Sequence, residues 1–143
     1  MELEGKIWKE GKFWLIEVPA IDVCTQGHTK KEALMMIEDA IYELLISYFP
    51  TEKIKDLKLE LIEHEKNIIG IKGSNNNIVL SFSLIRQREM SNLTVRDVAQ
   101  RLGSKSPNSY AQYERGKMGI SLDQYERLLK AVNPYSPPTL RIV

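Results

Sequence analysis

The stretch LTVRDVAQRLGSKSPNSYAQYERGK, residues 93–117, decides the C-terminal half of this chain. Asp97 follows Thr94 after three residues, a spacing that favours a helix N-terminus in which both side chains accept backbone N–H groups. Gly103 is a typical helix end, because glycine adopts the left-handed conformation without a steric penalty. We therefore expect a short helix between Thr94 and Gly103.

A second helix is expected after a tight turn. Ser106 is a typical N-cap, and Pro107 suits the first helical position, where a missing N–H removes no hydrogen bond. Gly116 then ends this helix. Two short helices joined in this way predict a helix-turn-helix, in which the second helix enters the major groove of DNA.

The second helix has two different faces. Tyr110 and Tyr113 are three residues apart and are expected to face the core, whereas the polar residues fall on the opposite side. Amide side chains read adenine, serine reads several base edges, and lysine and arginine contact phosphates. The expected DNA-binding residues are Lys105, Ser106, Asn108, Ser109, Gln112, Arg115 and Lys117. Further candidates for phosphate contacts are Arg86, Arg88 and Arg101.

These residues resemble the lambda-repressor-like (Xre) helix-turn-helix family. The resemblance spans about residues 84–133 and rests on LTVRDVAQRLG (93–103) and YAQYERGK (110–117). It implies double-stranded operator DNA as a partner and a structural role for Glu114. The chain departs from the family at Pro107, where a glutamine that reads a base is common.

The charge distribution divides the chain in two. Residues 1–80 hold ten lysines and fourteen acidic residues, a net charge of −4, whereas residues 81–143 have a net charge of +5. Every arginine lies after residue 85. Because guanidinium groups suit phosphate, this asymmetry favours a nucleic-acid partner for the C-terminal part and a different role for the acidic part.

The N-terminal part begins with alternating apolar and polar residues. We expect strands near residues 2–9 and 12–19, joined by a hairpin turn at Glu10-Gly11-Lys12, and a short third strand at residues 23–26. Cys24 on that strand is interpreted as a small buried hydrophobic residue.

A long amphipathic helix follows these strands. Thr29-Lys30-Lys31-Glu32 has the form of a capping box, and Pro50 stops the helix. Two further β-rich stretches follow at residues 57–63 and 67–82, and the second is predicted to be a hairpin around Ser74–Asn77.

The expected fold class is α+β, with a small sheet and one packed helix, followed by an all-α helix-turn-helix. We place the α+β domain at residues 1–82. The DNA-binding domain, with an extended C-terminal tail, is placed at residues 83–143.

The N-terminal part resembles the HicB family over VPAIDVCTQGHTKKEA, residues 18–33. This resemblance implies a partial RNase H-like fold. It also implies an antitoxin that inhibits a HicA-like mRNA-cleaving toxin and represses its own operon. The residues suggested for toxin contact are Trp14, Asp22 and Gln26. The chain has Asp22-Val23 where family members often have Pro-Gly.

Other functions have weaker support in the sequence. Glu17, Asp22, Glu38 and Asp39 could be taken for the metal-binding carboxylates of a nuclease, but solvated surface acids are the expected interpretation. We expect no enzyme, cofactor or metal site, because the chain has two histidines and one cysteine. A stand-alone regulator with a dimerising or ligand-sensing N-terminal domain is the alternative.

The sequence also bears on location and assembly. No signal peptide or membrane span is evident, so a cytoplasmic protein is expected. One module offers few contacts to DNA, and related repressors read two half-sites about 34 Å apart. A homodimer or higher homo-oligomer is therefore expected.

Overall fold

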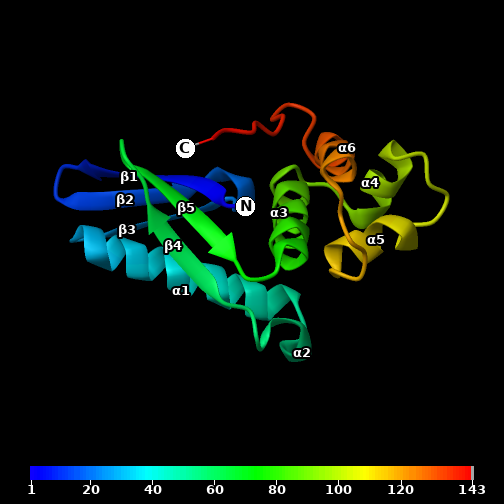
Figure 1. The fold of residues 1–143 in the computed structure, drawn as a ribbon. Coiled ribbons are helices and arrows are strands. Elements are labelled where there is room, and N and C mark those ends of the chain that lie inside the picture. The colour runs from blue at the N-terminus through cyan, green and yellow to red at the C-terminus, as the bar shows by residue number, and fades with distance from the viewer. Residues whose placement is uncertain (143) are drawn as a thin grey trace. The chain divides into compact units, whose positions relative to one another are not determined.

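The computed structural model describes residues 1–142. The chain forms two compact units, the first spanning Met1–Asn76 and the second beginning at Asn77 (Figure 1). The first unit contains β1 (Leu3–Glu10), β2 (Phe13–Val18), η1 (Pro19–Ile21), β3 (Val23–Gly27), α1 (Lys30–Tyr48), α2 (Thr51–Ile54), β4 (Leu59–Glu63) and β5 (Ile68–Gly73). The second contains α3 (Asn76–Met90), α4 (Val95–Arg101), α5 (Asn108–Glu114) and α6 (Leu122–Val132).

The first unit is a five-stranded sheet with α1 packed on one face. The strand order is β3-β2-β1-β5-β4, and every neighbouring pair is antiparallel. Alternate strand residues and one stripe of α1 are buried together, including Ile7, Ile16, Ile69, Ile37 and Ile41. The α+β class expected from the sequence is therefore confirmed for this unit, as are the first three strands and the long helix.

The N-terminus of α1 differs from a full capping box. The Thr29 hydroxyl accepts the Glu32 N–H at 3.0 Å, as expected. The Glu32 carboxylate, however, accepts the N–H of His28 at 3.2 Å rather than that of Thr29. Both contacts supply acceptors for N–H groups at or just before the helix start, which has no internal partners for its first N–H groups.

The hairpin expected around Ser74–Asn77 is wrong, because the residues after it are helical. α3 begins at Asn76, and the boundary expected between residues 82 and 83 falls inside this helix. The strand β5 pairs instead with β4, through a turn in which Lys66 and Asn67 have positive φ. A short apolar run such as Ile78-Val79-Leu80 fits a buried helix as well as a buried strand, so periodicity does not separate the two.

Two smaller expectations have different outcomes. Cys24 is exposed on β3, so its interpretation as a buried residue is wrong. At the end of the chain, no helix or strand follows Val132 as far as residue 142, and the Ser136 N–H donates to the Asn133 carbonyl in a turn.

The second unit has a small helical core. Its buried residues come from all four helices: Leu84, Val98, Ala99, Tyr110, Leu128, Leu129, Ala131 and Val132. The small side chain of Ala99 suits a close approach of helices, and Tyr110 faces inward as expected. The all-α architecture predicted for this part is thus present.

Backbone hydrogen bonds fix where α4 and α5 begin and end. Thr94 and Asp97 form a complete capping box, with distances of 2.8 and 3.1 Å. Gly103 and Gly116 have positive φ, as the sequence predicted. Each follows a helix closed by two backbone bonds, such as Lys117 N–H to the Gln112 carbonyl, which satisfy the last carbonyl groups.

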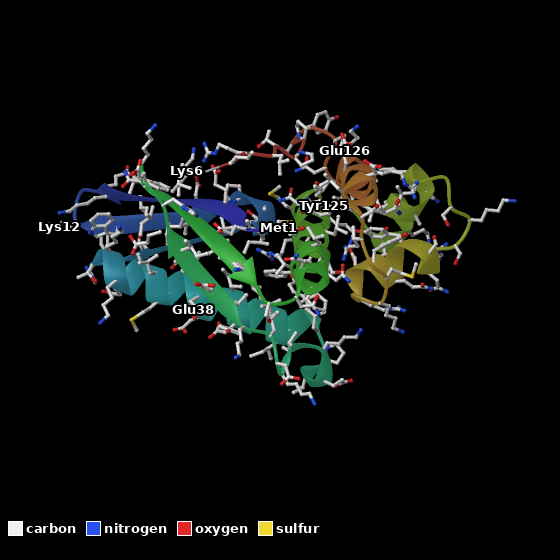
Figure 2. The ribbon with its side chains drawn as sticks, viewed as in Figure 1. Met1, Lys6, Lys12, Glu38, Tyr125 and Glu126 are labelled. Atoms are coloured by element: carbon white, nitrogen blue, oxygen red, sulfur yellow. The ribbon has the colours of Figure 1, made fainter. Side chains whose placement is uncertain are left out.

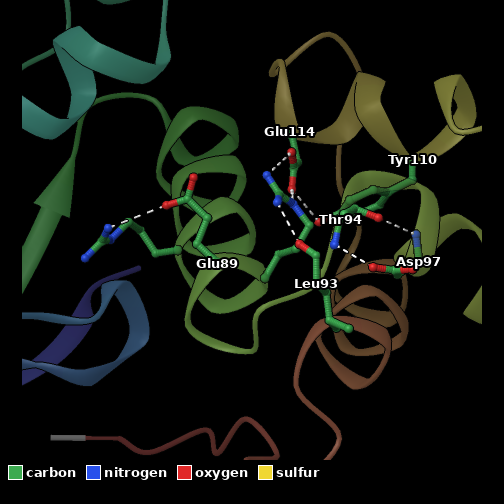
Figure 3. Close-up of polar contacts among 8 residues, drawn as sticks. Glu89, Leu93, Thr94, Asp97, Tyr110 and Glu114 are labelled. Carbon is green, nitrogen blue, oxygen red and sulfur yellow. Dashed lines mark hydrogen bonds and ion pairs between the residues drawn. The ribbon is translucent and has the colours of Figure 1, made fainter.

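A buried ion pair connects α3 to α5 (Figure 3). The Arg88 guanidinium donates to both oxygens of Glu114, at 2.6 and 3.2 Å, and also to the carbonyl of Leu93 at 2.9 Å. The Tyr110 hydroxyl donates to the same carboxylate at 2.8 Å. The side chains of Arg88 and Glu114 are only 15% and 10% exposed, so water competes weakly for these bonds.

The protonation states in this cluster follow from burial and charge. Burial alone would lower the pKa of Arg88, but the hydrogen bond and charge of Glu114 outweigh it and raise this pKa. Burial, with the charge and hydrogen bond of Glu114, raises the pKa of Tyr110 far above its usual value. Tyr110 therefore stays protonated and remains a donor to the carboxylate.

Three further polar contacts tie α3 to the helices around it. The Ser81 hydroxyl donates to the carbonyl of Tyr113 at 2.5 Å. The Ser83 and Tyr125 hydroxyls are 2.6 Å apart. The amide of Asn133 donates to the Gln87 side-chain oxygen at 2.8 Å. α3 therefore holds α5 and the C-terminal end of α6 in fixed positions.

The buried pair generates a stability prediction. Glu114→Ala leaves the Arg88 charge buried without its partner and should destabilise the second unit by about 3 kcal/mol. Glu126→Ala is the control, since Glu126 lies exposed on α6 (Figure 2) and pairs with Lys130 at the surface. It should cost less than about 1 kcal/mol. Urea unfolding followed by circular dichroism measures both, and equal losses would contradict the structural role of Glu114.

Candidate nucleic-acid interface

The turn before α5 and the first turns of that helix form an exposed polar surface. Lys105, Ser106, Asn108 and Ser109 are all exposed in this segment. Gln112 lies one turn after Asn108 and is half-buried. The structure thus brings together most of the residues that the sequence singled out for DNA contact.

The serines in this surface are used by the protein itself. The Ser106 hydroxyl accepts the Asn108 N–H at 3.3 Å, but α5 begins at Asn108 with Pro107 as its N-cap, so Ser106 is not the N-cap that the sequence predicted. The Ser109 hydroxyl donates to the Ser106 carbonyl at 3.0 Å and lies 2.7 Å from the Ser104 hydroxyl. Sequence reasoning missed Ser104, whose hydroxyl also donates to the Ser106 carbonyl at 2.9 Å. These bonds hold the turn in one conformation.

Pro107 shapes the same turn. Its φ of −65° and ψ of −21° are helical, and its carbonyl accepts the Ala111 N–H at 3.0 Å. The helix is assigned from Asn108, one residue later than expected. Within residues 1–142, the side chains of Asn108 and Gln112 have no hydrogen-bond partner. They are therefore free to bond an external group.

Three arginines before α5 were expected to make further contacts with phosphate, and each has a partner within the protein instead. Arg88 is occupied by Glu114 and Leu93, so that expectation is wrong for Arg88. Arg101 donates to the Ala131 carbonyl at 3.0 Å, and Arg86 lies 3.7 Å from Glu89. The guanidinium groups of Arg88 and Arg101 thus hold helices of the second unit together.

Sequence reasoning missed Arg96 in the first turn of α4. In the part of the chain that the structure describes, Arg96 is exposed and has no ion pair, and the same holds for Lys105, Arg115 and Lys117. The signal that could have found it is its position directly after the N-cap pair, since the first helix of such a motif crosses the DNA backbone. Asp97 is engaged by Thr94, whose backbone and side-chain hydrogen bonds lower its pKa.

The three residues suggested for toxin contact lie apart. Trp14 is half-buried at the end of β2 that pairs with Gly27, while Asp22 precedes β3 at the opposite end, with a positive φ of 49°. Gln26 is exposed on β3 and pairs with Leu15, on the sheet face that α1 does not cover. The structure does not bring these three side chains into one cluster.

The carboxylates considered for a nuclease are also separated. Glu17 lies between the buried Ile16 and Val18 and so projects from the sheet face opposite α1. Glu38 projects from α1 (Figure 2), and Asp39 is the next residue of the same helix. Among residues 1–142, no three His, Cys, Asp or Glu residues are placed to hold a metal ion.

Comparison with known proteins identifies the second unit. A helix-turn-helix family model matches residues 84–140, which begin within α3 and include α4, α5 and α6. A comparison with curated proteins finds no match to the chain. In the described residues no helix is long and apolar enough to cross a membrane. The C-terminal unit is therefore a helix-turn-helix of the DNA-binding kind found in transcription regulators.

Proposed function

We propose that this protein is a repressor that reads operator DNA with Asn108 and Gln112. The observation that carries the proposal is the exposed polar start of α5 within a unit that matches the helix-turn-helix family. The amides of both residues lack partners among residues 1–142, and bidentate pairing of such amides with adenine is a common base contact.

The phosphate contacts are assigned to the free cations. Arg96, Lys105, Arg115 and Lys117 have no ion pair in residues 1–142, so binding to phosphate breaks no internal contact. Ser106 and Ser109 are placed at the DNA surface mainly to position the turn. A homodimer then supplies two reading helices for two half-sites.

We further propose that the first unit is a HicB-like domain that neutralises a HicA-like toxin. Two features support this: the resemblance over residues 18–33 and the net charge of −4 in residues 1–80. An RNA-cleaving partner requires a basic surface, and opposite charge speeds encounter and favours the correct partner. Trp14, Asp22 and Gln26 remain separate candidates for contact, and a cytoplasmic location accompanies this role.

The alternative is a stand-alone regulator whose first unit dimerises or senses a small molecule. A small neighbouring gene that encodes a toxic protein favours the antitoxin, whereas its absence favours the alternative.

Base reading is tested by Gln112→Ala. This variant should weaken operator binding by about 1–3 kcal/mol and relax the sequence preference, because one amide contact to a base is lost. Gln26→Ala removes the same side chain from the sheet unit and should leave binding unchanged. Fluorescence anisotropy with the operator and with scrambled DNA measures both. If the parent protein and both variants bind the operator equally, α5 is not the reading helix.

Phosphate contact is tested by Arg96→Ala and Arg115→Ala. Each should weaken binding to all sequences to a similar extent and reduce the slope of log K against log salt by about 0.9. Lys130→Ala is the control, since Lys130 already pairs with Glu126 at 3.2 Å. Titrations between low and moderate salt give the slopes. A slope that stays at the parent value in both arginine variants contradicts these contacts.

The antitoxin role is tested by co-expression with the neighbouring gene product. Growth arrest by the neighbour should be relieved by the full chain and equally by its Gln112→Ala variant, because toxin binding is assigned to the first unit. If the parent protein fails to restore growth, the antitoxin role is contradicted, whereas the proposed DNA-binding role is unaffected.

A further inference from the structure

The strand β4 forms one edge of the sheet and pairs only with β5. Its inward residues are identified by two contacts with the β5 side. Ser74 N–H donates to the Lys58 carbonyl at 2.9 Å, and His64 N–H donates to the Ile68 carbonyl at 2.8 Å. Because backbone groups alternate in direction along an antiparallel pair, the intervening odd-numbered residues point their N–H and C=O outward.

A third contact agrees with this alternation. The outward N–H of Leu59 donates to the Tyr42 hydroxyl of α1 at 3.1 Å. Within residues 1–142, the outward N–H and C=O groups of Leu61 and Glu63 have no partner. The strand contains neither proline nor a bulge, the usual features that block pairing at a sheet edge.

The side chains around this edge are partly apolar. Leu59, Leu61 and Ile62 are half-buried. On α1, Met35 and Ile46 are 55% and 66% exposed, on the same side of the helix as Tyr42. The opposite edge strand, β3, instead carries the small or polar central residues Cys24, Thr25 and Gln26. Covering the β4 edge would therefore remove more apolar surface from water than covering the β3 edge.

The charges near β4 are balanced. Glu63 forms an ion pair with Lys30 of α1. Glu60 lies directly opposite Lys72 of β5 in the sheet register. Because no charge of one sign dominates this edge, it attracts neither a strongly basic nor a strongly acidic partner, and it suits a copy of itself.

We propose that β4 pairs antiparallel with β4 of a second copy, with Leu61 opposite Leu61 across a two-fold axis. In this register each outward residue meets an outward residue, since Leu59 lies opposite Glu63. This register offers four new backbone hydrogen bonds: two between the Leu61 residues and one from each Glu63 N–H to a Leu59 carbonyl. The Leu59 N–H is not counted, because it already donates to the Tyr42 hydroxyl.

The side-chain pairs in this register are compatible. Glu60 lies opposite Ile62 and Glu63 opposite Leu59, so no like charges face each other directly. The two-fold axis is perpendicular to the sheet, so both copies carry α1 on the same face. Met35 and Ile46 of each copy then face the neighbouring copy rather than water.

The inference deepens the proposed function and rests on it in one respect. Two copies joined through β4 bring two helix-turn-helices into one assembly, as reading two half-sites requires. The pairing itself, however, is a property of the first unit and can be measured without DNA.

Site-directed cross-linking tests the register in the full-length chain. Leu61→Cys is placed in a Cys24→Ser background, which removes the exposed native thiol. Directly opposite hydrogen-bonded residues have Cα atoms about 5.5 Å apart, within the range that a disulfide spans. Under mild oxidation this variant should form a covalent dimer in the absence of DNA.

Glu60→Cys in the same background is the matched control. In the proposed register the two Glu60 residues are offset by two positions along the strands, which places their Cα atoms beyond about 7 Å. It should cross-link at least about tenfold more slowly than Leu61→Cys. Equal rates for the two variants, or no dimer from Leu61→Cys, would overturn the proposal.

Leu61→Lys gives a second measurement that does not depend on disulfide chemistry. A lysine at a sheet edge opposes strand pairing, so sedimentation velocity should show this variant shifted to monomer at micromolar concentration. Circular dichroism checks that it is folded. A folded variant that sediments as the parent dimer contradicts the interface. Cross-linking without operator binding would instead refute the proposed function and leave the interface intact.

Discussion

The buried contact between Arg88 and Glu114 is the interaction on which the DNA-binding unit depends. It joins α3 to α5, and the same carboxylate also accepts the Tyr110 hydroxyl. A charge pair of this kind is costly to desolvate and offsets that cost only when its hydrogen bonds are complete. Here a third guanidinium N–H of Arg88 donates to the Leu93 carbonyl, so the arrangement tolerates little rotation of α5. The orientation of the exposed residues follows from this constraint.

Arginines in this unit therefore have two distinct roles. Arg88 and Arg101 donate hydrogen bonds to other groups of the protein. Arg96 and Arg115, in contrast, have no ion pair within residues 1–142. Net charge alone does not separate the two groups. The separation depends on whether a carboxylate or a helix-end carbonyl lies within reach of each guanidinium. The arginines without such a partner are the ones that we propose for contacts with phosphate.

The first unit is built differently from the second. Within residues 1–76, α1 covers one face of its sheet, and β3 and β4 form the two edges. α1 buries one face, and the α1 side chains Lys30 and Tyr42 reach β4 through an ion pair and a hydrogen bond. Among the described residues, 1–142, none pairs with the outward N–H and C=O groups of Leu61 and Glu63 at that edge. An open edge is compatible with a soluble protein when a defined partner covers it.

The sequence by itself determined the local structure wherever one residue type is required. Thr94 and Asp97 cap α4, and Gly103 and Gly116 end the two central helices, because these roles depend on short-range backbone geometry. Two features of the chain path required the tertiary structure: residues 78–82 are helical, and β5 pairs with β4. The same holds for the roles of two arginines, since Arg88 pairs with Glu114 whereas Arg96 has no ion pair within residues 1–142. These features depend on partners distant in sequence, and a buried apolar run or a charged side chain carries no local signal of which partner it will meet.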